Sequence, residues 1–161
     1  MTIEEYNSSV DSFSDGLYRF ILRNIKNEDK AKDIVQDTYE KLWLKVESVS
    51  FLKVKSYLYT AAYHTMIDLI RREKKQTDFE RINQEDYSHS EQYNDLNEIL
   101  HKALEKLPEI QRSVILLRDY EGYSYNEISE ITDLNESQVK VYIYRGRLFL
   151  KKFIGSLETV V

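Results

Sequence analysis

Helix-breaking residues are scarce along this chain. One proline, Pro108, and four glycines are spread over 161 residues, whereas glutamate, lysine, leucine and isoleucine recur in long stretches. Glycine and proline are the residues that most disfavour a helix interior, so stretches without them can form continuous helices. Apolar residues also recur at spacings of three and four, which is the period of an amphipathic helix. The sequence therefore predicts an all-α protein.

Three consecutive helices are predicted in the first part of the chain. Residues 17–25 carry apolar side chains at helical spacing, and Asn27 is a good N-cap for a second helix that ends before residues 47–51 interrupt the period. A third helix runs from Val54 to about Lys75. Short turns between helices favour a bundle of three to four helices, so residues 1–75 are predicted to form one domain. The apolar stripe of the second helix is formed by Ala31, Ile34, Val35, Tyr39, Leu42, Trp43 and Val46.

Residues 76–94 have a different composition. They are polar and show little periodicity, and residues 76–97 contain six acidic side chains against one basic side chain. Such a segment is too polar to bury, and its negative charge would keep it from competing for DNA. We therefore predict an acidic, flexible linker between two domains.

The second predicted domain, residues 95–161, contains a helix-turn-helix. Pro108 suits the first turn of a helix, and Gly122 indicates a turn. Ser124 and Glu127 have the spacing of a capping box at the start of a short helix. Asn135 and Gln138 have the same spacing at the start of a longer one. A short helix, a turn and a longer helix is the arrangement by which many proteins bind DNA.

The last predicted helix is basic within an acidic protein. The whole chain has a net charge of −5, yet residues 137–152 contain five basic side chains and no acidic one. Val139, Ile143, Leu148 and Leu150 are expected to face the core. The opposite side could enter a major groove, where Gln and Lys meet base edges and the later Arg and Lys meet phosphates. The predicted DNA-binding residues are Gln138, Lys140, Val141, Tyr144, Arg145 and Arg147.

Three segments resemble those of a known family. "LPEIQRSVILLRDYEGYSYNEISEITDLNESQVKVYIYRGRLFLKKF" resembles region 4 of bacterial RNA polymerase sigma factors, the domain that reads the −35 promoter element. "DKAKDIVQDTYEKLWLK" resembles region 2.2, and "SYLYTAAYHTMIDLIRREKK" resembles region 2.4, which reads the −10 element. Two domains joined by a short linker are the layout of the extracytoplasmic-function (ECF) group. The resemblance extends from about Phe13 to Phe153.

The resemblance implies an alternative sigma factor that directs promoter-specific initiation. Its partners would be promoter DNA, the β′ clamp helices and β flap of core RNA polymerase, and an anti-sigma factor. The polymerase would bind a polar, acidic helix face around an apolar centre, although the residues alone are equally consistent with a merely solvated face. The residues that the resemblance assigns to core polymerase are Asp33, Gln36, Asp37 and Glu40.

The resemblance also implies a −10 site in the stretch from Val49 to His64, with nearby basic residues as far as Lys75. Opening duplex DNA without ATP requires the capture of unstacked bases, which aromatic faces and a basic surface favour. About half of the aromatic side chains in this stretch are expected to be core, with Leu58, Tyr59 and Ala62 buried. The residues expected to contact −10 DNA are Phe51, Lys53, Lys55, Tyr57, Tyr63, His64, Arg71 and Arg72.

The chain departs from the family pattern at several of these positions. Many members have Arg-Asn in place of Tyr63-His64, and small polar or basic residues are common where Val141 and Tyr142 stand. Gly146 replaces the usual alanine, at a cost of up to about 1 kcal/mol in a helix interior. The general role survives these changes, whereas a promoter sequence carried over from a relative would not.

Other functions receive less support from the sequence. The chain contains no cysteine, its three histidines have no metal-ligand spacing, and it lacks a P-loop, so neither catalytic residues nor a cofactor, metal or small-molecule substrate is expected. Without a signal-peptide pattern or a long apolar run, a cytoplasmic protein is expected. Two alternatives remain. A helix-turn-helix regulator would bind a palindromic operator without polymerase. An anti-sigma antagonist that copies sigma surfaces would not need the basic helix.

Overall fold

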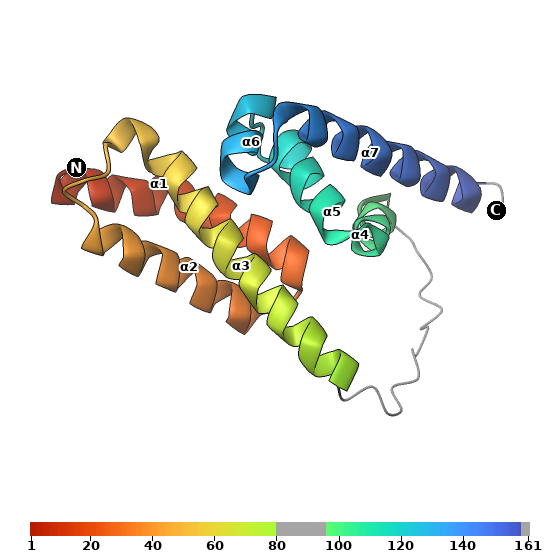
Figure 1. Cartoon of the computed structure of the whole chain (residues 1–161), viewed down its shortest axis with the longest axis horizontal. Coiled ribbons are helices and arrows are strands. Elements are labelled where there is room, and N and C mark those ends of the chain that lie inside the picture. The colour runs from red at the N-terminus through yellow and green to blue at the C-terminus, as the bar shows by residue number, and fades with distance from the viewer. Residues whose placement is uncertain (80–95, 159–161) are drawn as a thin grey trace.

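The computed structural model describes residues 1–79 and 96–158. Within these residues the chain forms helices joined by turns and contains no strand, which confirms the predicted all-α class. Two groups of helices lie against each other (Figure 1). The first group consists of α1 (Ile3–Ile25), α2 (Glu28–Leu44), the 3-10 turn η1 (Phe51–Lys53) and α3 (Val54–Phe79). The second consists of α4 (Leu96–Lys106), α5 (Glu109–Ile115), the π-helical turn η2 (Leu116–Tyr120), α6 (Tyr125–Thr132) and α7 (Glu136–Glu158).

Helix α1 begins fourteen residues before the predicted Leu17, at Ile3. Its first turn is closed by a capping box, in which the Glu5 backbone N–H donates to Thr2 Oγ1 at 3.1 Å and the Thr2 N–H donates to Glu5 Oε1 at 2.9 Å. The following turns are polar and are joined to α2 by hydrogen bonds. Tyr39 donates its hydroxyl to the Ser9 carbonyl at 2.9 Å, and Tyr6 donates to the Tyr39 carbonyl at 3.1 Å. Although these turns are largely polar, Tyr6, Val10 and Phe13 pack against the core at steps of four and three, so the apolar period of α1 begins before Leu17 and the predicted start was too late.

The first bundle has the predicted core with one exception. Asn27 caps α2 by accepting the Lys30 backbone N–H at 3.0 Å, and Ala31, Ile34 and Leu42 are buried. Trp43, which was expected in the apolar stripe, is 48% exposed and therefore lies at the surface. Its ring instead contacts Tyr6 edge-on, with 5.1 Å between the ring centroids.

The second group contains the predicted helix-turn-helix. Ser124 and Glu127 form the reciprocal capping box at the start of α6, with both hydrogen bonds at 3.1 Å. Asn135 and Gln138 exchange the same pair of bonds at 3.0 and 2.8 Å at the start of α7. The turn between these helices begins at Asp133, whose φ of 61° is left-handed. These local predictions are confirmed.

Helix α7 packs on α5 through one side. Val139, Ile143 and Leu150 are buried as predicted, whereas Leu148 is 41% exposed and the prediction for it is wrong. The buried positions 139, 143, 146 and 150 follow helical steps of three and four, and position 148 falls between two of them on the other side. At Gly146 the two helices approach closely, because an added Cβ would lie 2.2 Å from Ile115 Cδ1.

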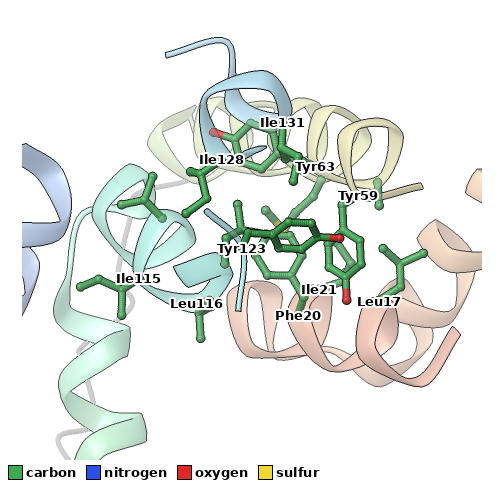
Figure 2. Close-up of a cluster of buried hydrophobic side chains, with 14 of the residues drawn as sticks. Leu17, Phe20, Ile21, Tyr59, Tyr63, Ile115, Leu116, Tyr123, Ile128 and Ile131 are labelled. Carbon is green, nitrogen blue, oxygen red and sulfur yellow. The ribbon is translucent and has the colours of Figure 1, made fainter. Parts of the chain in front are cut away.

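The two groups share one continuous hydrophobic core (Figure 2). Leu17 and Phe20 of α1 and Tyr59 of α3 belong to the same cluster as Tyr123 and Ile128 of the second group. Helix α3 lies against α6, which brings the middle of the first domain next to the first helix of the helix-turn-helix. The sequence predicted two domains and did not predict this contact.

Helix α3 continues to Phe79, four residues beyond the predicted end at Lys75. The remainder of the predicted linker, residues 80–94, lies outside the described residues. In residues 1–79 and 96–158, no helix is both long and apolar enough to cross a bilayer.

Candidate nucleic-acid interface

The exposed side of α7 contains all six residues predicted to bind −35 DNA. Val141 is 43% and Tyr144 68% exposed, although both are large and apolar or aromatic. Gln138, Val141 and Arg145 line a shallow groove together with Asn135 at the helix start. The groove therefore begins at the N-terminal turn of α7, which is the part of a recognition helix that contacts base edges. The six residues are Gln138, Lys140, Val141, Tyr144, Arg145 and Arg147.

Two basic side chains of this surface already have protein contacts. Lys140 Nζ lies 5.5 Å from the centre of the Tyr125 ring of α6. Arg147 donates from Nε to Asp119 Oδ2 at 3.1 Å, and this hydrogen bond raises the pKa of the Arg147 guanidinium. Arg145 is exposed and carries its charge toward solvent. Arg145 is therefore the arginine of α7 that could meet DNA without first leaving a carboxylate.

The predicted −10 residues extend along η1 and α3, and seven of the eight are exposed or partly exposed. Phe51 is 37% exposed and Tyr57 is partly exposed. Leu52, between Phe51 and Lys53, is 96% exposed and is not among the residues predicted from the sequence. A single leucine between turn residues gives little sequence signal, so only the structure identifies this apolar tip. The exposed or partly exposed members of the predicted set are Phe51, Lys53, Lys55, Tyr57, His64, Arg71 and Arg72.

Three of the predicted −10 residues lie next to the second domain, and one of them, Tyr63, is buried. Tyr63 is 5% exposed, and burial raises the pKa of its hydroxyl, with the Glu109 carboxylate adding to the rise. Lys55 Nζ lies 4.7 Å from the centre of the Tyr123 ring. His64 Nε2 lies 3.6 Å from Asp133 Oδ2. In this arrangement Tyr63 cannot reach DNA, because the second domain covers it.

An acidic face on α2 is open to solvent. Asp33, Gln36 and Glu40 are exposed or partly exposed, and Asp37 is partly exposed and forms an ion pair with Lys41 at 3.0 Å. Leu44, at 83% exposure, continues the same helical line beyond Glu40. The four predicted residues therefore share one face with an exposed apolar end, which has the composition of a protein-binding surface.

These surfaces define a class of protein. The chain has three distinct surfaces: an exposed basic recognition helix in a helix-turn-helix, an aromatic and basic edge on the other helical domain, and a separate acidic helix face. This combination characterises a two-domain DNA-binding protein that also docks on another protein. Residues in the described ranges form no group of histidines and carboxylates that could hold a metal ion.

Comparison with known proteins agrees with this class. Residues 10–76 match the family described as Sigma-70 region 2, and residues 97–150 match Sigma-70, region 4. The chain is 37% identical over 132 residues to the RNA polymerase sigma factor SigV of Bacillus subtilis (strain 168). The aligned region covers 80% of this chain and 78% of that relative. It is 34% identical to the sigma factor YlaC of the same organism, with 84% of each chain covered.

A solved structure shows the same fold over nearly the whole chain. The sigma factor RpoE from Bartonella quintana, crystallised with the anti-sigma factor NepR, superposes with a TM-score of 0.79 and 25% identity, covering 95% of this chain and 98% of that one. The chain therefore belongs to the sigma-70 family of RNA polymerase sigma factors, within the extracytoplasmic-function group. Its function is promoter-specific transcription initiation, as the family resemblance implied.

Proposed function

We propose that the chain binds core RNA polymerase through α2 and contacts promoter DNA through α7 and the η1–α3 edge. The observation that carries this proposal is the position of the six predicted −35 residues, which all lie on the exposed side of the second helix of a capped helix-turn-helix. No role in catalysis and no cofactor is needed, because binding and base capture perform the whole task.

At the −35 element, the N-terminal turns of α7 would enter the major groove. Gln138 accepts the Asn135 N–H through its amide oxygen, so its NH₂ group stays available to donate to a base edge. Val141 is placed to contact a thymine methyl group, and Arg145 to contact a phosphate or a guanine. Arg147 already donates a hydrogen bond to Asp119, so we expect it to contribute less to DNA binding than Arg145 does.

At the −10 element, the first domain would hold bases that have left the duplex stack. Phe51 and Leu52 present apolar surface at the exposed tip of η1, and Tyr57 lies one turn into α3. Stacking on the aromatic rings of Phe51 and Tyr57 would offset the cost of unstacking a base by about 1–3 kcal/mol each, and Leu52 would add apolar contact. Lys53, Arg71 and Arg72 would neutralise the phosphates of the same strand.

On the polymerase, the acidic face of α2 would meet the β′ clamp helices, and the second domain would meet the β flap. Charge complementarity around Asp33, Asp37 and Glu40 would orient the encounter, and Leu44 would supply apolar contact area beside them. We also propose an anti-sigma factor as a regulatory partner and the cytoplasm as the site of action. The superposition with a sigma factor solved in complex with an anti-sigma factor supports the first of these.

Size-exclusion chromatography of the purified chain with bacterial core RNA polymerase tests the proposal. Co-elution, followed by initiation at discrete sites on a genomic DNA library, is the expected result. Binding to duplex DNA without co-elution would instead favour a self-sufficient helix-turn-helix regulator, for which a palindromic operator is expected.

A further inference from the structure

A cavity of about 490 Å³ lies between α1, the start of α2 and α4. Its volume is within the range of about 300–1,000 Å³ that is usual for small-molecule sites. None of its lining residues is among those assigned above to −35 DNA, −10 DNA or core polymerase. A ligand could therefore occupy this cavity without meeting any of those surfaces.

Three basic side chains line the cavity from one side of α1. Arg19, Arg23 and Lys26 are separated by steps of four and three, the spacing that places residues on one face of a helix. On α4, His101 adds an imidazole to the lining. Glu28, at the start of α2, contributes a carboxylate, so fixed positive charges outnumber negative ones among the lining residues. This composition favours an anionic ligand.

Arg23 is the arginine of this group with donors to spare. Its guanidinium lies over the Tyr120 ring, 4.3 Å from the ring centre, whereas the guanidinium of Arg19 donates two hydrogen bonds to Glu121. Within residues 1–79 and 96–158, Arg23 has no carboxylate partner. A ring face positions a guanidinium without occupying its N–H donors, so these remain available to an anion.

Lys26 has a backbone conformation that is unusual for a lysine. It caps the end of α1 with φ at 54° and ψ at 34°, the left-handed region that helix ends most often fill with glycine. A residue with a Cβ is strained in this region, and such strain is concentrated at functional sites. Ending the helix would by itself favour glycine. The side chain of Lys26, which lines the cavity, must therefore account for the lysine.

The surroundings of the Lys26 ammonium group are rich in positive charge. Burial lowers the pKa of Lys26, and the nearby Lys102 and Arg112 lower it further, although Lys26 also forms an ion pair with Glu105. One carboxylate thus does not offset the desolvation and repulsion at this position. A bound anion would supply the missing negative charge.

Apolar side chains complete the cavity. Leu22 of α1 and Leu104 of α4 line it, and Leu104 is 3% exposed. We propose that the cavity binds a nucleoside phosphate, with the phosphate held by Arg23 and Lys26 and the planar base against the two leucines. Guanidinium and ammonium groups are the side chains that proteins use most to hold phosphate. The sugar hydroxyl groups would find an acceptor in the Glu28 carboxylate.

Isothermal titration calorimetry of the purified full chain tests this proposal. The probes are ATP and GTP, with inorganic pyrophosphate as a probe that lacks the base and adenosine as a probe that lacks the phosphate. At least one nucleotide should bind saturably with one site per chain. Pyrophosphate should bind more weakly by about tenfold or more, and adenosine should show no measurable binding, because the phosphate supplies the charge-assisted hydrogen bonds. Absence of saturable binding by ATP, GTP and pyrophosphate would overturn the proposal.

Two substitutions separate ligand binding from folding. Arg23→Gln should weaken nucleotide binding by about tenfold or more, because it removes the guanidinium and keeps a polar side chain. Lys26→Gly should weaken binding to a similar extent without lowering the unfolding temperature of the free chain. Glycine adopts the left-handed φ without strain, and the ion pair with Glu105 that it removes is partly exposed. A lysine with a purely structural role would give the opposite result, a less stable chain with unchanged affinity.

Arg145→Gln is the matched control, because it removes the same charge from the exposed face of α7, where a nucleotide phosphate could bind without specificity. Its nucleotide affinity should differ from wild type by less than about twofold. Equal weakening by Arg145→Gln and Arg23→Gln, or unchanged affinity in both cavity variants, would overturn the site. These titrations use neither polymerase nor promoter DNA, so their failure would leave the proposed function intact, and failure of the chain to co-elute with core polymerase would leave the site intact.

Discussion

Replacing Gly146 by alanine should destabilise the second domain, although alanine is the better helix former. The new Cβ would lie 2.2 Å from Ile115 Cδ1 and 3.3 Å from Ile115 Cγ1, whereas ordinary carbon contacts are about 3.5–4.0 Å. Ile115 is 1% exposed, so it has little free space into which to move. Overpacking of this kind costs about 1–3 kcal/mol, and the gain in helix propensity returns up to about 1 kcal/mol. With the full gain in propensity, the net expectation is a loss of up to about 2 kcal/mol.

Urea unfolding followed by far-ultraviolet circular dichroism measures this difference. Gly155→Ala is the matched control, because Gly155 lies in the same helix and an added Cβ meets nothing within 4 Å. That variant should be neutral or stabilised by up to about 1 kcal/mol.

Ile115→Val removes the Cδ1 methyl with which the new Cβ collides. Adding Gly146→Ala to the Ile115→Val chain should therefore lower the free energy of unfolding much less than adding it to the wild-type chain does. The difference between these two effects, the coupling free energy, should be about 1 kcal/mol or more. If Gly146→Ala raises stability as much as Gly155→Ala does, the close approach of α5 and α7 is not what selects glycine at this position, and the reasoning fails.

Three further predictions concern single side chains. Arg145→Ala should weaken binding to a cognate −35 duplex by about 1.5–3 kcal/mol, and Arg145→Lys by less if the contact is to a phosphate; equal affinity of Arg145→Ala and wild type in fluorescence anisotropy would exclude the role. Asp37→Arg should abolish co-elution with core polymerase while Asp11→Arg, an exposed reversal on α1, should not; normal co-elution of the Asp37 variant would remove that residue from the interface. Burial raises the pKa of Glu109 despite the nearby Arg112 and Arg71, so the stability that protonated Glu109 contributes is present at low pH and is lost as pH rises through its raised pKa. Glu109→Gln should therefore unfold at higher urea than wild type at pH 7 and at the same urea near pH 4, and identical midpoints at pH 7 would contradict this.

Local features of the fold were predictable from the sequence because they depend on a few neighbouring residues. The capping residues Ser124 and Asn135 have their bonding partners three positions away, so residue spacing alone was enough to locate the helix-turn-helix. The exposed face of α7 followed from helical spacing and charge. Leu148 was misassigned because a run of alternating apolar residues allows two choices of buried face, and contact with α5 decides between them.

Contacts between distant segments could not be predicted in this way. Arg19 and Glu121 are separated by 102 positions, and neither has a neighbour in sequence that indicates an ion pair between the two groups of helices. Tyr63 lies in an amphipathic helix whose exposed face was assigned to DNA, but the second domain buries it. The first half of α1 was missed although Tyr6, Val10 and Phe13 continue its apolar stripe, because the many polar and acidic residues between them obscured the period.

The aromatic pair of Tyr59 and Tyr123 also bears on how long an active molecule survives. The two rings contact each other across the boundary between the two groups of helices, so separation of these groups would remove that contact from both. Proteases and chaperones act on apolar surface that is exposed by such openings. The contact that buries these two rings therefore also protects the chain, and weakening it is expected to shorten the lifetime of the protein as well as to change its shape.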